Sequence, residues 1–132
     1  MDGREAESFV PVRLVAHVEA EGASRVSVPG AWLLADVTGF TPLANRLGVR
    51  FGAAGAERLS RTLNGLFGRL LPIVRDEGGE VSKFAGDAML VWFPTSGGRD
   101  LAEAARAAAR CAGAMLDVLA VMEPVEGETP SL

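Results

Sequence analysis

The sequence predicts an α/β (α+β) fold in which helices cover one face of a mixed β-sheet. Three observations support this class: an apolar run over residues 31–37, helical spacing of apolar residues over 59–74 and 101–122, and two strand-like segments within 80–93. The order strand, helices, strand hairpin and helix is typical of a ferredoxin-like fold. A further strand would complete such a sheet, and none is predicted here, so the last strands of the fold are expected to be lacking.

Residues 31–37 form the first predicted strand. Their nearly continuous apolar run is typical of a central strand that is covered on both faces. Asp36 interrupts the run at its C-terminal end. The tight turn that follows leads into a helix, with Thr41 suited to the N-cap and Pro42 to the first helical position. We expect this helix to end by Gly48.

A longer helix is predicted next, because apolar residues recur at spacings of three and four while most arginines fall elsewhere. Pro72 is expected to kink its last turn, and Gly78 and Gly79 are expected to end it. The predicted apolar stripe consists of Leu59, Leu63, Leu66, Phe67, Leu70, Leu71 and Val74.

Two short apolar-rich strands, 80–84 and 88–93, flank the sequence Ala-Gly-Asp, which predicts a hairpin with Asp87 at its turn. After a loop, Asp100 is suited to cap a third helix that runs from residue 101 to about residue 122. The predicted packing face of this helix consists of Leu101, Ala105, Ala108, Ala112, Met115 and Leu119.

The domain is predicted to span residues 9–122, between a loose N-terminus over 1–8 and a disordered acidic tail over 123–132. Residues 10–18 alternate enough to suggest a short strand or a packed segment. His17 lies in this segment without a second metal-ligating residue, so it is interpreted as a structural or surface residue.

Composition excludes several classes of function. The 132 residues carry a formal net charge of -4, which argues against binding to nucleic acid or to an anionic membrane, since both need a basic surface. The sequence holds no apolar run of ~20 residues and no signal-peptide pattern, so no membrane span is expected and the cytoplasm is the expected location. The single cysteine, Cys111, is interpreted as a core thiol.

Asp36 and Asp87 are the candidate site. They can converge if the first strand and the hairpin are neighbours in one sheet. Two carboxylates without His or Cys favour Mg²⁺ or Mn²⁺ over zinc, and the carbonyl of Val37 could add a ligand. The turn over 38–41 opens a helix whose free N–H groups suit phosphate oxygens. Taken singly, each aspartate could equally be an ordinary turn or cap residue.

Three motifs resemble class III adenylate and guanylate cyclase catalytic domains. They are Leu-Leu-Ala-Asp-Val-Thr-Gly-Phe-Thr, Gly-Ala-Glu-Arg-Leu, and Gly-Gly-Glu-Val-Ser-Lys-Phe-Ala-Gly-Asp-Ala-Met-Leu-Val-Trp-Phe-Pro. The likeness runs over about residues 10–121, is strongest over 31–94, and is closest to the soluble, bicarbonate-responsive branch.

The resemblance implies a domain that dimerises head to tail, either as a homodimer or with a second cyclase domain, and that converts ATP to cyclic AMP and pyrophosphate. Two ions, Mg²⁺ or Mn²⁺, would carry this chemistry, so no histidine base is required. The implied metal ligands are Asp36, Asp87 and the backbone of Val37, and the implied phosphate-binding residues are Gly39, Phe40 and Thr41. Lys83 would contact adenine or, as in the first domain of the soluble branch, bicarbonate.

The chain also departs from this family. The later strands of the family's domain carry a second base-contacting residue, and an Asn and an Arg that stabilise the transition state across the dimer. In this chain no such residue follows Asp117. A partner is therefore expected to supply them. The alternative is a truncated, non-catalytic module that binds nucleotide, metal or bicarbonate for regulation or dimerisation. A diguanylate cyclase is disfavoured, because the hairpin reads Ala-Gly-Asp-Ala-Met and lacks the second acid.

Overall fold

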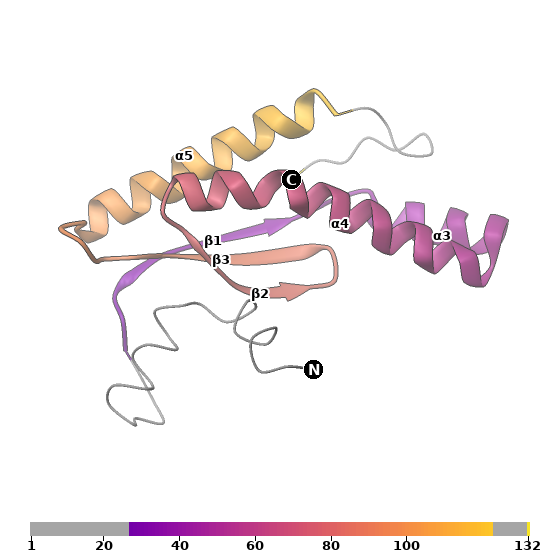
Figure 1. Cartoon of the computed structure of the whole chain (residues 1–132), viewed down its shortest axis with the longest axis horizontal. Coiled ribbons are helices and arrows are strands. Elements are labelled where there is room, and N and C mark those ends of the chain that lie inside the picture. Colours follow the sequence, from indigo (N-terminus) through magenta and orange to yellow (C-terminus); the bar gives the residue numbers. More distant parts are fainter. Residues whose placement is uncertain (1–26, 123–131) are drawn as a thin grey trace.

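The computed structural model describes residues 27–122 and Leu132. The predictions for residues 1–8, for 10–18 with His17, and for the acidic tail up to residue 131 lie outside the described residues. The described elements follow one another as β1 (Gly30–Asp36), α3 (Phe40–Phe51), α4 (Ala53–Asp76), β2 (Glu80–Ala85), β3 (Ala88–Pro94) and α5 (Leu101–Ala120) (Figure 1).

The three described strands form one sheet in the order β1-β3-β2, and both neighbouring pairs are antiparallel. β1 and β2 therefore run in the same direction, and the hairpin inserts β3 between them. This arrangement confirms the predicted class, helices beside a sheet, but corrects two details. The described sheet is antiparallel rather than mixed, and β3 rather than β1 is its central strand.

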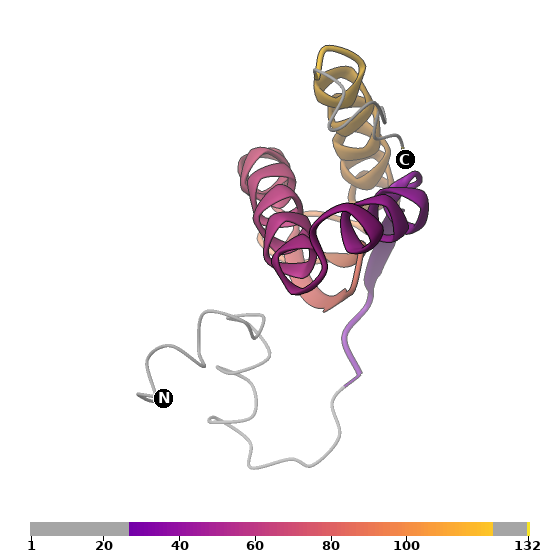
Figure 2. The ribbon, with the colours of Figure 1, turned by 90° about the vertical axis from the view of Figure 1, so that its right-hand side faces the viewer.

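Helices α4 and α5 lie on the same side of the sheet, and α3 packs beside α4 (Figures 1 and 2). Strand residues point alternately to the two faces, so Met89, Val91 and Phe93 of β3 are fully buried under the helices. On the opposite face of β1, Trp32 and Leu34 remain 57% and 66% exposed. The expectation that both faces of the first strand are covered is therefore wrong for the described residues.

The apolar stripe of α4 is confirmed, because Leu66, Phe67, Leu70 and Val74 are buried and the other predicted members pack partly buried against them. On α5, Ala108, Met115 and Leu119 are buried as predicted, but the first turn packs through a different side. Leu101 and Ala105 are exposed, because Ala104 is the residue of the first turn of α5 that packs into the core. The buried face of α5 consists of Ala104, Ala107, Ala108, Cys111, Met115 and Leu119.

Cys111 is fully buried on this face, as predicted. Desolvation raises the pKa of its thiol to about 11.

The start and length of α3 differ from the prediction. Its N-cap is Gly39, which has a φ of 87°, so Thr41 lies inside the helix and does not cap it. Pro42 is the third helical residue, where a missing N–H costs no hydrogen bond within the helix. The helix continues through Gly48 to Phe51, because a single glycine weakens a helix without ending it.

The end of α4 is set by a turn that satisfies its last carbonyls. Pro72 lies inside the helix, which continues to Asp76. Gly78, with a φ of 72°, donates its N–H to Arg75, and Gly79 donates to Val74 at 2.8 Å. These two bonds form a Schellman motif, which reverses the chain into β2.

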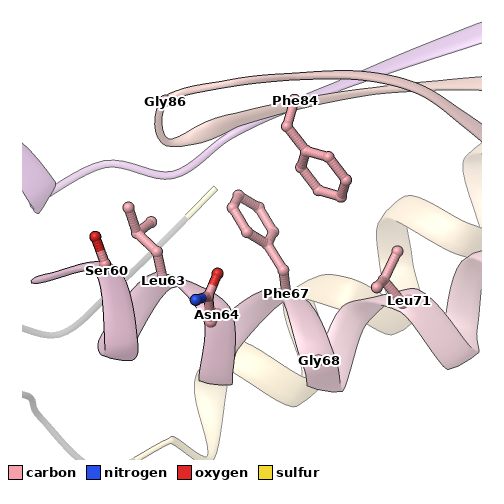
Figure 3. Close-up of a pocket in the computed structure, with 8 residues that line it drawn as sticks. All are labelled: Ser60, Leu63, Asn64, Phe67, Gly68, Leu71, Phe84 and Gly86. Carbon is pink, nitrogen blue, oxygen red and sulfur yellow. The ribbon is translucent and has the colours of Figure 1, made fainter. Parts of the chain in front are cut away.

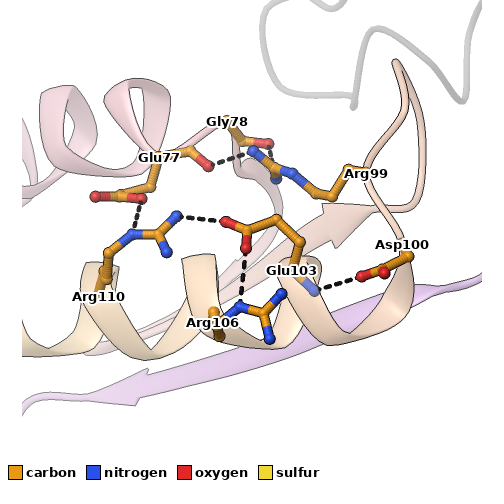
Figure 4. A network of polar contacts seen from close by, with 7 residues as sticks. All are labelled: Glu77, Gly78, Arg99, Asp100, Glu103, Arg106 and Arg110. Atoms are coloured by element: carbon orange, nitrogen blue, oxygen red, sulfur yellow. Dashed lines mark hydrogen bonds and ion pairs between the residues drawn. The ribbon is translucent and has the colours of Figure 1, made fainter.

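The same turn is tied to the start of α5 (Figure 4). Arg99 donates to the carbonyls of Glu77 and Gly78, and Arg110 bridges the carboxylates of Glu77 and Glu103 at 2.9 and 3.0 Å. Hydrogen bonds from Arg106 and Arg110 lower the pKa of Glu103. Asp100 caps α5 as predicted, accepting from the Glu103 N–H at 2.7 Å.

Candidate functional site

Asp36 and Asp87 lie side by side at one end of the sheet. Asp36 is the last residue of β1 and pairs in register with Ala88, the residue after Asp87. The N–H of Val37 donates to the carbonyl of Asp87 at 3.1 Å. The backbone thus fixes the two aspartates relative to each other, although their role in metal binding stays a prediction.

The hairpin turn holds Asp87 in place. Ala85 and Ala88 form the last pair of the β2–β3 ladder, and Gly86 and Asp87 connect them. Gly86 has a φ of 63°, a conformation that glycine adopts without strain and that suits a tight hairpin. Asp87 is half-buried in this turn, whereas Asp36 is exposed.

The turn between β1 and α3 presents backbone donors beside these carboxylates. Val37 and Phe40 are buried, at 2% and 4% exposure, so the turn is anchored to the core at both ends. Among the described residues, no side chain caps the N-terminus of α3, and no acidic residue lies in the first turn of this helix. The first N–H groups of a helix, with the positive end of its dipole, favour an anion. Gly39, Phe40 and Thr41 lie at this helix start, and their binding of phosphate stays a prediction.

Lys83 lies on the same face of the sheet as Asp36 because β2 contains a bulge. The register shifts between Val81 and Lys83, so that Lys83 pairs with Leu90 and not with Met89. Leu90 in turn pairs with Leu34, which lies on the face of β1 that carries Asp36. Simple alternation from Val81 would have turned Lys83 toward the helices.

Asp36 and Lys83 are therefore diagonal neighbours across β3. Strand spacing and rise place their Cα atoms roughly 12 Å apart. Lys83 is exposed there, so its ammonium group can reach a ligand on this face.

The open face of the sheet also carries an aromatic pair, which the sequence did not indicate. The rings of Trp32 and Trp92 stack with centroids 6.2 Å apart. Trp92 is buried to 7% exposure, and its indole N–H has no hydrogen-bond partner among the residues that the structure describes. The apolar surface of Trp32 and Leu34 therefore lies on the same face as Asp36 and Lys83.

The chemistry of the acids suits a metal shared with a ligand. Within residues 27–122, no group of three or more His, Cys, Asp or Glu side chains could hold a metal ion by itself. Mg²⁺ commonly binds through one or two carboxylates together with substrate phosphates. Asp36, Asp87 and the nearby start of α3 offer that combination.

Comparisons with known proteins show the fold. No protein-family profile matches the chain, and no curated protein matches its sequence. Among solved structures, the chain is similar to a bacterial light-regulated adenylyl cyclase, with a TM-score of 0.59 and 23% identity over 89% of this chain. The match covers 32% of that protein, so the chain spans about a third of its length. The cyclase-like fold is thereby confirmed, and the soluble, bicarbonate-responsive branch is not distinguished.

No helix within the described residues is long and apolar enough to cross a membrane. The cytoplasmic location stays a prediction.

Proposed function

We propose that this chain is a nucleotide cyclase domain that converts ATP to cyclic AMP and pyrophosphate as one part of a dimer. The observation that carries the proposal is the pairing of Asp36 and Asp87 at the end of the sheet through the bond from Val37. Two motifs far apart in the sequence are joined there beside a helix start that suits phosphate. The cyclase-like fold supports the same conclusion.

The carboxylates of Asp36 and Asp87, with the carbonyl of Val37, would hold two Mg²⁺ or Mn²⁺ ions. Such ions lower the pKa of an attacking hydroxyl and neutralise charge on the leaving phosphates. Asp36 is exposed at the sheet edge, so it can approach a ligand without a change of backbone. Gly39, Phe40 and Thr41 would orient the polyphosphate through their N–H groups.

Lys83 would select the base. Its ammonium group donates hydrogen bonds and accepts none, which suits the acceptor nitrogens of adenine. The choice of ATP over GTP rests on this residue, and binding of bicarbonate by Lys83 stays a separate prediction. Because Lys83 is roughly 12 Å from Asp36 across the sheet, one nucleotide held at both would lie along the open face.

A second cyclase domain would cover that open face. Trp32 and Leu34 are large apolar side chains with more than half of their surface exposed, and association would remove that surface from water. The buried indole N–H of Trp92 would gain an acceptor there if the partner presented one. The partner would also supply the groups that stabilise the transition state.

A second candidate is a non-catalytic cyclase-like module that binds nucleotide and metal for regulation or dimerisation. The described site favours it in one respect. Asp36 and Asp87 can hold metal, but carboxylates do not stabilise the negative charge that develops on a transferring phosphate.

The test is a mixed dimer. The chain is combined with a cyclase domain of the light-regulated enzyme in which the two positions that match Asp36 and Asp87 carry alanine, so that metal binding depends on this chain. We expect Mn²⁺-dependent cyclic AMP that is lost with Asp87→Ala and kept with Asp117→Ala, an exposed control on α5. ATP binding without product would favour the non-catalytic module. If the pair shows no ATP binding and no product, both functions are contradicted.

A further inference from the structure

A cavity of about 450 Å³, open to solvent on one side, lies between α4 and the hairpin, on the helix side of the sheet (Figure 3). Its floor is one stripe of α4, and its other wall comes from β2 and the hairpin turn. Small-molecule pockets commonly have volumes of about 300–1,000 Å³ and mostly apolar linings. The lining residues are Ser60, Leu63, Asn64, Phe67, Gly68, Leu71, Phe84 and Gly86.

Phe67 and Phe84 form the aromatic part of the cavity. Their ring centroids are 5.0 Å apart and their planes are tilted by 58° (Figure 3). Phe67 is buried, but Phe84 keeps 37% of its surface exposed although it lies on the helix side of the sheet. A flat apolar group beside Phe84 would cover that surface and meet both rings in favourable tilted or offset geometry.

Gly68 lines the cavity and presents no side chain to it. It lies in the interior of α4, where glycine is less favourable than alanine by about 1 kcal/mol. Its φ is not positive, and a Cβ built there would meet no atom within 4 Å. Neither backbone conformation nor packing among the described residues requires a glycine at position 68, and the same holds for Gly65, which does not line the cavity.

The polarity of the lining limits the ligand. Ser60 and Asn64 lie one helical turn apart and supply a hydroxyl and an amide, while none of the described residues that line the cavity is ionisable. The lining therefore offers no opposite charge to an ionised ligand, which favours an uncharged one. We propose that this cavity binds an uncharged, flat apolar molecule with one hydrogen-bonding group directed at Ser60 or Asn64.

The cavity is distinct from the candidate nucleotide site. Lys83 and Phe84 are consecutive and pair with Leu90 and Met89, so they point to opposite faces of the sheet. Gly86 likewise lines the cavity while its neighbour Asp87 belongs to the candidate site. A ligand here would contact the residues that precede Asp87 from the helix side of the sheet, so it would not compete with nucleotide. The proposal does not depend on cyclase activity.

Indole is the probe, because it is uncharged, bicyclic and carries one N–H donor. The full chain is titrated with indole while amide chemical shifts are followed by heteronuclear NMR. We expect saturable shifts at Phe84 and Gly86. Indole acetate, which adds a carboxylate, is expected to bind more weakly by about tenfold.

Two matched variants locate the binding. A leucine at position 68 extends toward the preceding turn of α4 and fills the cavity, so Gly68→Leu should weaken indole binding by about tenfold or more. Gly65→Leu adds the same side chain on the exposed side of α4, where a Cβ also meets nothing within 4 Å, and should leave binding unchanged. Absence of saturable shifts, or equal loss in both folded variants, would overturn the proposal.

Discussion

The N–H of Val37 donates to the carbonyl of Asp87, and this 3.1 Å bond joins two segments that lie 50 residues apart in the sequence. It closes the sheet ladder one step beyond the last pair of β1 and β3, Asp36 and Ala88. The main chain thus fixes the positions of Asp36 and Asp87, and their side-chain carboxylates are left available for a ligand.

Removing either carboxylate should therefore weaken the binding of metal and nucleotide with little effect on folding. We expect Asp36→Asn to weaken Mn²⁺-ATP binding by about tenfold or more, since asparagine is a neutral and poorer ligand for a hard cation. Isothermal calorimetry measures the affinity, and thermal unfolding checks the fold. Asp117→Asn, also at an exposed position, is the control. Equal affinity in Asp36→Asn and the unaltered chain would exclude Asp36 from the metal site.

The bulge in β2 should tolerate removal of its extra residue. Ser82 lies between Val81, which pairs with Val91, and Lys83, which pairs with Leu90, so deleting Ser82 leaves both pairs and both faces unchanged. The deletion should therefore keep Lys83 on the open face and change the free energy of unfolding by about 1 kcal/mol or less. Deleting Val81 instead places Ser82 opposite Val91 on the helix side, and this loss of apolar burial should cost about 1–3 kcal/mol. Chemical denaturation of both variants makes the comparison, and equal losses of stability would contradict this register.

Gly79 should tolerate no side chain. A Cβ there would lie 2.8 Å from the ring of Phe93 and 2.9 Å from the Cγ1 of Val91, and both residues are fully buried. Gly79→Ala should destabilise the chain by about 1–3 kcal/mol through overpacking. Gly65→Ala, in open space on α4, should instead stabilise it by about 0.5–1 kcal/mol. Urea unfolding gives both values, and the same sign for both would contradict this packing.

Cys111 should make the free energy of unfolding fall at alkaline pH. Burial raises the pKa of its thiol from 9.0 to about 11, so the unfolded chain loses this proton first as the pH rises. The contribution of the thiol to the free energy of unfolding is complete below pH 9 and is lost as the pH approaches 11. Over this range the free energy falls by up to about 1.4 kcal/mol per pH unit. The difference in unfolding free energy between the unaltered chain and Cys111→Ala, measured from pH 8 to about pH 11, should shrink over this window. A constant difference would show that the thiol titrates normally.

The sequence predicted the elements of this fold well because periodicity records which side of a helix or strand is buried. It gave the stripe of α4 and the position of Asp87 in a hairpin, both of which depend on local pattern. It missed the bulge at Ser82 and the start of α3 at Gly39, since each depends on backbone conformation rather than on side-chain polarity. The stacked pair of Trp32 and Trp92 depends on strand register, which no local pattern in this chain specifies.

The same register places Trp32 on the face proposed for the partner domain, and this leads to the last prediction. Trp32 is 57% exposed and stacks on Trp92, so truncating it removes apolar surface without opening the core beneath the helices. Trp32→Ser should weaken self-association or association with a second cyclase domain by about tenfold or more, because aromatic anchors dominate such interfaces. Val49, which is 92% exposed on α3, offers the control variant Val49→Ser. Sedimentation over a range of concentrations measures the dissociation constants, and equal constants for both variants would place the partner on another surface.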